Sequence, residues 1–338
     1  MRYYRPLLLA ATLLAFAVVT LGAYVRLSDA GLGCPDWPGC YGQLIGVPDA
    51  APERASALAA FPDKPLVARK AWKEMVHRYC AGALGLLIAM IAVLAWHQRR
   101  ALRQSPVLPG VLVGIVVFQA LLGMWTVTEL LKPMVVSAHL LGGMTTLALL
   151  VWLLLRQRPQ PQVSPATELL LPATLALVAV VIQIALGGWV SSNYAALACS
   201  DFPTCLGAWL PEMDFTRAFQ LHRDLGQNAD GSLLSNAALT AIHWSHRLGA
   251  LIVALIVGRL ALLLSGRRDW RRWGLLLGAA LGVQIAIGIA NILLFLPLPL
   301  AVAHNAGAAV LLCVTLALNL RLWQAKGGIP QSSQKTRR

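Results

Sequence analysis

The stretch at residues 134–155, MVVSAHLLGGMTTLALLVWLLL, decides the class of fold. It carries no charged side chain and is long enough to cross a bilayer as a helix, which takes about 20 apolar residues. Of the 338 residues in the chain, 58% are hydrophobic and only 12% are charged, which excludes a soluble domain of this length. Seven further apolar runs predict spanning helices at about 7–25, 76–95, 107–127, 169–190, 241–264, 273–295 and 300–322.

The formal net charge of +14 is explained by membrane topology and does not indicate nucleic-acid binding. Lys and Arg gather in the short connections on one side of the predicted membrane, and the positive-inside rule assigns that side to the cytoplasm. Both termini are therefore expected in the cytoplasm, with residues 326–338 as a basic tail. The basic residues on this side are Arg2, Arg5, Arg99, Arg100, Arg103, Arg156, Arg158, Arg267, Arg268, Arg271, Arg272, Arg321, Lys326, Lys335, Arg337 and Arg338.

An internal repeat divides the chain into two units, 1–160 and 161–325. Each unit has four predicted helices, and an even number gives both units the same orientation in the membrane. The predicted fold is therefore an all-α integral membrane protein with eight transmembrane helices, in two tandem four-helix bundles related by a pseudo-two-fold axis along the membrane normal. A shift of 165 residues superposes Leu21-Gly22 on Leu186-Gly187, segment 34–42 on 199–207, Gln119 on Gln284, Gly123 on Gly288, His139 on His304, and Gly142 on Gly307.

Histidines occupy matched positions in the two units. His77 and His139 in the first correspond to His246 and His304 in the second. A single membrane histidine is as often a structural hydrogen-bonding group, but four at duplicated positions indicate a functional site. Each unit places two imidazoles at similar depth near the outer ends of different helices, an arrangement that holds a planar cofactor in a four-helix bundle. Imidazole is a common axial ligand of haem iron, so the pattern favours bis-histidine haem. A zinc site needs three or four ligands in one shell, and no cysteine or carboxylate cluster supplies them.

Small and basic residues accompany these histidines. Gly142-Gly143 lies near His139 and Gly307 near His304, which suits either close helix packing or a flat macrocycle. Arg78 and Arg247 each follow a histidine directly. They are candidates for charge-assisted hydrogen bonds to haem propionates, with ordinary interfacial arginines as the alternative.

One position beside the histidines breaks the repeat. Glu74 precedes His77 by about one helical turn, on the same face, whereas the second unit has His243 at the matching place. Duplicated proteins often keep one site for chemistry and the other for support, so Glu74 is a candidate catalytic carboxylate. The alternative is a boundary glutamate that pairs with Lys73 or Arg78.

Two long outer loops, at about 26–75 and 191–240, each carry a pair of cysteines in the frame C-x-D-aromatic-P-x-C-x-G. The oxidising side of the membrane favours the disulfides Cys34–Cys40 and Cys199–Cys205. They serve either as structural staples or as redox-active dithiols. Each loop is also expected to contain one short amphipathic helix.

Taken together, the E-x-x-H-R at 74–78, the A-H at 138–139, the second H-R and A-H, and the cysteine-bearing first loop resemble the haem A synthase family. The resemblance extends through residue 323. It implies an enzyme of the bacterial cytoplasmic (inner) membrane that oxidises the C8 methyl of haem O to a formyl group, giving haem A for cytochrome oxidase. It also implies roles for the residues above: His77 and His139 hold the substrate haem, Glu74 is the essential carboxylate, and His246 and His304 bind a resident haem b.

The same resemblance implies a set of partners and leaves two rival functions open. Haem O is the expected substrate, haem O synthase its expected supplier and membrane lipid the surroundings, with an unidentified electron donor, no nucleic acid, and a homo-oligomer as an open alternative. One rival is a dihaem cytochrome that passes electrons from quinol, which would place ligands near both membrane faces. The other is a haem transporter or chaperone, which would need neither Glu74 nor a second fixed haem.

Overall fold

The computed structural model describes residues 3–102, 105–157 and 163–327. Eight helices in these ranges are long and apolar enough to cross a membrane, and the prediction of an all-α membrane protein is confirmed. The tail predicted at 326–338 lies outside the described residues from residue 328 on, as do Arg2, Arg103 and Arg158. The helices are α1 (Tyr4–Leu27), α3 (Ala68–His97), α5 (Val107–Thr128), α6 (Pro133–Arg156), α7 (Leu170–Ser192), α9 (Asn236–Ser265), α10 (Arg271–Leu293) and α11 (Leu298–Gly327).

Two of these helices begin further out than their apolar runs predict. α3 starts at Ala68 and not near residue 76, because its first turns are made of charged residues that form helix well but fail a hydropathy criterion. α9 starts at Asn236, where the Ser235 hydroxyl caps the helix by accepting the Ala238 N–H at 3.2 Å. His77 therefore lies about two and a half turns inside α3 and not at its start, which corrects its expected position.

The outer loops each contain a short helix, as expected: α2 (Ala51–Ala60) in the first and α8 (Phe215–Ala218) in the second. The second loop also has a 3-10 turn, η2 (Ala195–Leu197). Each loop has a small apolar core of its own against the helices beneath it, which fixes the loops over the outer helix ends. On the inner side lie α4 (Arg99–Leu102) and the 3-10 turn η1 (Thr167–Leu169).

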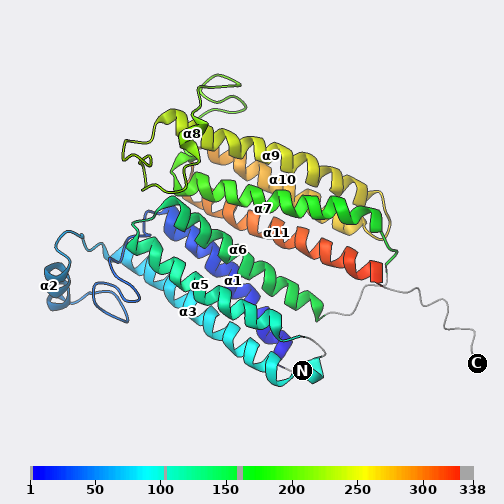
Figure 1. Cartoon of the computed structure of the whole chain (residues 1–338), viewed down its shortest axis with the longest axis horizontal. Helices are drawn as coiled ribbons and strands as arrows, with labels where there is room; N and C mark the ends of the chain where they lie inside the picture. The colour runs from blue at the N-terminus through cyan, green and yellow to red at the C-terminus, as the bar shows by residue number, and fades with distance from the viewer. Residues whose placement is uncertain (1–2, 103–104, 158–162, 328–338) are drawn as a thin grey trace, which may run out of the picture.

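The eight spanning helices pack as two rings of four (Figure 1). In the first half α1, α3, α5 and α6 follow one another around the ring, and in the second half α7, α9, α10 and α11 do the same. Across the interface α1 packs on α11, α6 on α7, and α6 on α11. In the repeat, α1 corresponds to α7 and α6 to α11. Exchanging the corresponding helices turns the α1–α11 contact into the α6–α7 contact and leaves the α6–α11 contact unchanged, as a pseudo-two-fold axis between the halves requires.

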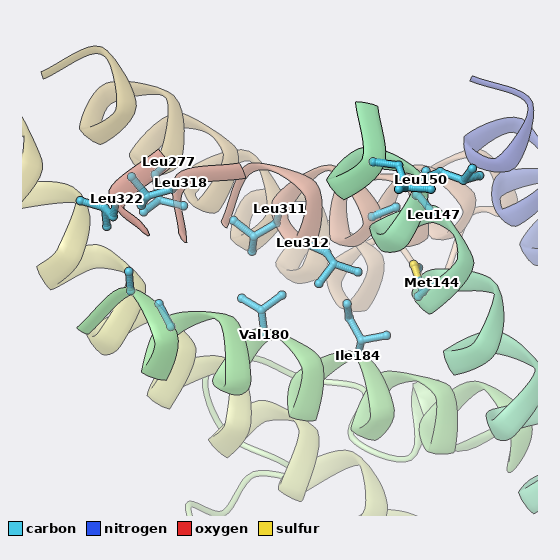
Figure 2. Close-up of a cluster of buried hydrophobic side chains, with 14 of the residues drawn as sticks. Met144, Leu147, Leu150, Val180, Ile184, Leu277, Leu311, Leu312, Leu318 and Leu322 are labelled. Carbon is cyan, nitrogen blue, oxygen red and sulfur yellow. The ribbon is translucent and has the colours of Figure 1, made fainter. Parts of the chain in front are cut away.

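The interface between the halves is a close-packed apolar layer (Figure 2). Met144, Leu147 and Leu150 of α6 lie beside Val180 and Ile184 of α7 and the leucines of α11. Leu150 and Leu318 are fully buried. Because lipid is as apolar as leucine, such a layer holds helices together through van der Waals packing, not through the exclusion of water.

The backbone repeats as well as the sequence. The non-glycine residues with positive φ form four matched pairs at the repeat spacing, an uncommon conformation that recurs at equivalent points. Asp29 (φ 51°) matches Tyr194 (φ 53°), Tyr41 (φ 52°) matches Leu206 (φ 54°), Leu130 (φ 48°) matches Phe295 (φ 57°), and Leu131 (φ 61°) matches Leu296 (φ 59°).

Candidate functional site

Helix packing places the four repeated histidines on diagonal helices. His77 is on α3 and His139 on α6, which stand opposite each other in the first ring, and His246 on α9 faces His304 on α11 in the second. Each histidine lies in the half of its helix that is nearer the disulfide loops. The two imidazoles of each half therefore stand on opposite helices of one ring. The structure thus brings together the residues that the sequence paired, two per half.

Each of the four imidazoles packs on a glycine of a neighbouring helix. A Cβ added to Gly22 of α1 would lie 2.9 Å from His77 Cε1, and one added to Gly123 of α5 would lie 3.4 Å from His139 Cε1. In the second half a Cβ on Gly187 of α7 would lie 3.1 Å from His246 Cε1, and one on Gly288 of α10 would lie 3.0 Å from His304 Cε1. A side chain at any of these positions would press on the ring.

The chemistry of these side chains fits a bis-imidazole ligand set for haem iron. Nδ1 of His77, His139 and His304 is buried without a hydrogen-bond partner in the described structure, and an unpaired buried polar atom is costly. Within the described ranges, no three His, Cys, Asp or Glu side chains lie close enough to bind one metal ion. The histidine pairs therefore lack the third ligand that a zinc site requires. Two facing imidazoles in an apolar bundle are the donor set that takes the axial positions of a haem.

Glutamine side chains pack against two further repeated glycines, Gly142 and Gly307. A Cβ on Gly142 would lie 1.7 Å from Gln119 Nε2, and one on Gly307 would lie 2.2 Å from Gln284 Oε1. Glutamine side chains therefore fill the space beside Gly142 and Gly307, and room for a macrocycle at these glycines stays a prediction. Gln284 Nε2 also donates to the main-chain oxygen of His304 at 3.0 Å.

Glu74 is a buried carboxylate, 5% exposed, that fastens the first outer loop to α3. Its Oε2 accepts the N–H of Cys34 at 3.0 Å, and its Oε1 accepts from Arg78 Nη2 at 2.5 Å. Of the partners expected for a boundary glutamate, Arg78 is the one it meets. This pairing does not decide between the catalytic and the structural role, since a carboxylate held on two sides is also well oriented.

His243 makes the same two contacts in the second half. Its Nδ1 lies 3.4 Å from the N–H of Cys199, and its Nε2 accepts from Arg247 Nε at 3.2 Å. The break in the sequence repeat is therefore a change of chemical group at an unchanged place in the architecture.

The two arginines are engaged by the disulfide loops. Arg78 donates to the main-chain oxygens of Asp36 (2.9 Å), Pro38 (3.2 Å) and Gly39 (2.5 Å). Arg247 donates to those of Thr204 (2.7 Å), Cys199 (2.8 Å) and Asp201 (2.7 Å). Both clamp a loop onto a helix, a role that the sequence did not suggest, and contact with haem propionates stays a prediction.

Both predicted disulfides are present, each closing a loop between residues six apart. Cys34 and Cys40 have a Cα–Cα distance of 4.8 Å, and Cys199 and Cys205 one of 4.7 Å. Inside each loop an aspartate, Asp36 or Asp201, accepts two main-chain N–H groups at matched positions. The loops are thus small rigid units bound to the helix that carries the first histidine of each pair.

Fold and site together define a class: membrane proteins of eight helices built by duplication, with a diagonal pair of imidazoles in each half, toward the face that carries the disulfide loops. Residues 5–316 match the COX15-CtaA family, cytochrome oxidase assembly protein, and the chain belongs to this family. It is 44% identical over 309 residues to the "Heme A synthase" of Shewanella oneidensis, covering 90% of this chain and 92% of that one.

More distant relatives carry the same name. The "Heme A synthase" of Shouchella clausii is 28% identical over 257 residues, 73% of this chain and 78% of the relative. That of Caulobacter vibrioides is 27% identical over 332 residues, 91% and 93% of the two chains. The similarity therefore spans both halves and is not confined to one of them.

Proposed function

We propose that the chain is a haem A synthase, an enzyme that oxidises the C8 methyl of haem O to a formyl group and so supplies haem A for cytochrome oxidase. Family membership and the 44% identical relative support this activity. The structural observation that carries the proposal is the diagonal histidine pair, seated on glycines and present in each half. Two such pairs suit one haem that is transformed and one that stays.

The first half is assigned to the substrate and the second to a resident cofactor. His77 and His139 hold haem O, and His246 and His304 hold haem b. The resident haem supplies one-electron transfer to the reaction when bound. The assignment of halves rests on Glu74, because the half that contains a buried carboxylate beside its ligand offers a group that the other half lacks.

The chain's own residues hold and orient the reacting methyl edge and limit access of water. The glycine seats fix the plane of each imidazole by contact with the ring. The first disulfide loop, bound by Arg78 and Glu74, covers the outer end of α3 above His77. Glu74 has both carboxylate oxygens fixed, so it can stabilise charge that develops at the substrate without moving, which is the form of electrostatic catalysis that costs least reorganisation.

The protein is proposed to lie in the bacterial cytoplasmic membrane with both termini in the cytoplasm. Arg99, Arg156 and Arg267 at one set of helix ends support this orientation through the positive-inside rule. Large apolar side chains exposed on the helices, among them Leu86 and Leu262 at 77% each, face lipid. Haem O synthase is the proposed source of the substrate, and the electron donor is unidentified.

A dihaem cytochrome that carries electrons across the bilayer fits the site less well. Such a protein needs ligands near both membrane faces, whereas the four repeated histidines all lie in the half of their helices that is nearer the disulfide loops. A haem carrier, the other alternative, has no use for a second fixed site.

The decisive experiment adds haem O to the purified protein with a reductant and oxygen and analyses the extracted haem by chromatography. Formation of haem A supports the proposal, and its absence from protein that retains haem b and binds haem O contradicts it. A variant with both His77 and His139 changed to Ala is the matched control, because it should keep the second site while losing the substrate.

A further inference from the structure

The two halves differ in one buried contact beside the first histidine of each pair. In the second half Gln183 of α7 reaches His246 of α9: its Nε2 donates to the main-chain oxygen at 2.9 Å and lies 3.0 Å from Nδ1 of the ring. At the matched position the first half has Val18, which can form no hydrogen bond. His77 Nδ1 is accordingly buried without a partner in the described structure.

A glycine makes the Gln183 contact sterically feasible. A Cβ at Gly249 would lie 2.2 Å from Gln183 Oε1 and 2.9 Å from Leu186 Cδ1, so any larger residue there would displace the glutamine. Gly249 follows His246 by three residues, and Cys80 follows His77 by the same number. The second half thus pairs Gln183 with Gly249 where the first half pairs Val18 with Cys80. The two sequence differences depend on each other, because the Gln183 amide fits only where residue 249 has no side chain.

We propose that Gln183 is a positioning residue that fixes the His246 imidazole as a permanent axial ligand, and that Val18 and Cys80 leave His77 free to exchange its haem. This inference rests on the proposed function, since it assigns the resident haem to the second half. An imidazole that binds iron through one nitrogen carries a hydrogen on the other, and the acceptor of that hydrogen fixes the ring and raises its basicity.

Gln183 is equipped to be that acceptor. Its Oε1 is buried without a hydrogen-bond partner in the described ranges, and a half-turn of the amide, which gives up the Nε2 bond to the His246 main-chain oxygen, presents this oxygen to His246 Nδ1. The other glutamines do not distinguish the halves, because Gln119 and Gln284 occupy matched positions next to His139 and His304. Of the three glutamines beside the repeated histidines, Gln183 is the one that has no counterpart in the other half.

The test is a reciprocal exchange in the full-length protein, read by haem retention and by the midpoint potential of the bound haem b. Gln183→Val should raise the rate of haem b transfer to excess apomyoglobin by about 10- to 100-fold, the usual effect of losing such a partner. It should also shift the midpoint potential upward, because a less basic imidazole favours the ferric state less. Gln183→Glu, which keeps an oxygen acceptor, should retain haem and shift the potential downward. In the first half, Val18→Gln combined with Cys80→Gly should slow release of haem O.

The outcomes separate this inference from the proposed function. His246→Ala is the reference variant: if it keeps its haem b, the haem site itself is assigned wrongly. If His246→Ala loses haem b while Gln183→Val keeps both its transfer rate and its midpoint potential, the site stands and the role of Gln183 is overturned. If Gln183→Val does not fold, two other results test the inference. These are a downward shift of the midpoint potential in Gln183→Glu and slower release of haem O from the Val18→Gln, Cys80→Gly double variant. The absence of both overturns the inference.

Discussion

The two halves of the molecule repeat one arrangement of four helices but have different groups around their histidines. Their loops repeat the same left-handed residues, the same disulfide spacing and the same arginine clamp. The differences fall at the place of Glu74 and His243 and at the place of Val18 and Gln183. Glu74 and His243 are on the ligand-bearing helices α3 and α9, and Val18 and Gln183 are on α1 and α7, which pack against those helices. At these positions the backbone arrangement is the same in both halves and the side chain differs, so we expect these side chains to distinguish the roles of the halves.

The Glu74 and His243 pair illustrates this most directly. Both lie against the N–H of the first cysteine in their loop and against the neighbouring arginine; the Glu74 carboxylate accepts from both, whereas a neutral His243 imidazole accepts at one ring nitrogen only. The architecture needs an acceptor there and takes either a carboxylate or an imidazole. The two halves therefore place different chemical groups at one point of the architecture, and a catalytic role for the Glu74 carboxylate stays a prediction.

The largest effect is expected at the ligands of the second half. His246→Ala or His304→Ala removes one axial ligand and its packing against glycine, so the purified protein should contain little haem b. The measurement is haem per chain from the pyridine haemochrome spectrum. His97→Ala, at the exposed inner end of α3, is the matched control and should keep its haem. Unchanged haem content and spectrum in both ligand variants would refute the assignment of the halves.

The next largest effect is expected from replacing Glu74 by the residue at the matching position of the second half. Glu74→His installs the residue that the second half uses, so it should keep the loop anchored and haem bound while haem A formation falls to little or none. A group used only in the transition state lowers turnover without weakening ground-state binding. Glu74→Gln, which keeps the shape and removes the charge, should behave alike.

The readout for these variants is haem A yield per enzyme, with bound haem O and haem b quantified separately. His243→Gln is the matched change in the second half and should be milder. Near-normal yield from Glu74→His would mean that Glu74 is an anchor only. A larger loss from His243→Gln than from either Glu74 variant would mean that the catalytic and supporting halves are reversed.

Much of this comparison could be predicted from the sequence, because apolar runs and a fixed repeat spacing are local signals. They gave the eight helices and the histidine pairs. The packing of His77 on Gly22 and of His246 on Gly187 could not be predicted. The repeat shows that both glycines occupy matched positions, but it does not indicate which helix packs against them. Gln183 has no repeated counterpart, so a search for matched positions passes over it. The loop carbonyls that bind Arg78 depend on a conformation that no spacing encodes.

A moderate effect on stability, equal in both halves, is expected from the disulfides. Closing a loop of this length stabilises by roughly 2 kcal/mol in the chain-entropy description. Cys34→Ser with Cys40→Ser, and Cys199→Ser with Cys205→Ser, should each lower the thermal midpoint in detergent by a similar amount. If the bonds are staples, turnover per folded molecule should change less than stability. A selective loss of turnover in the first pair alone would instead indicate a redox role in that half.

The smallest difference between the halves concerns how the loops respond to acid. Asp36 and Asp201 accept matched main-chain N–H groups, but Asp201 also accepts the Thr204 hydroxyl, where the first loop has Gly39. These bonds, the one from Thr204 first, lower the pKa of Asp201 from its ordinary 3.8 to about 2. A carboxylate whose pKa is lowered on folding stabilises the loop above its ordinary pKa and loses that contribution as the pH falls through the folded value.

Asp201→Asn should therefore loosen the second loop at pH 6, where the unchanged protein has the full contribution, and should matter little near pH 2, where that contribution is already lost. The measurement is hydrogen exchange at the amides of Leu206 and Gly207, corrected for the intrinsic effect of pH on exchange. Thr204→Gly, which copies the first loop, should give a smaller loosening at pH 6 because two of the three bonds remain. Equal protection in all three proteins at pH 6 would show that these bonds do not set the stability of the loop, and the two loops would then be equivalent in acid as they are in shape.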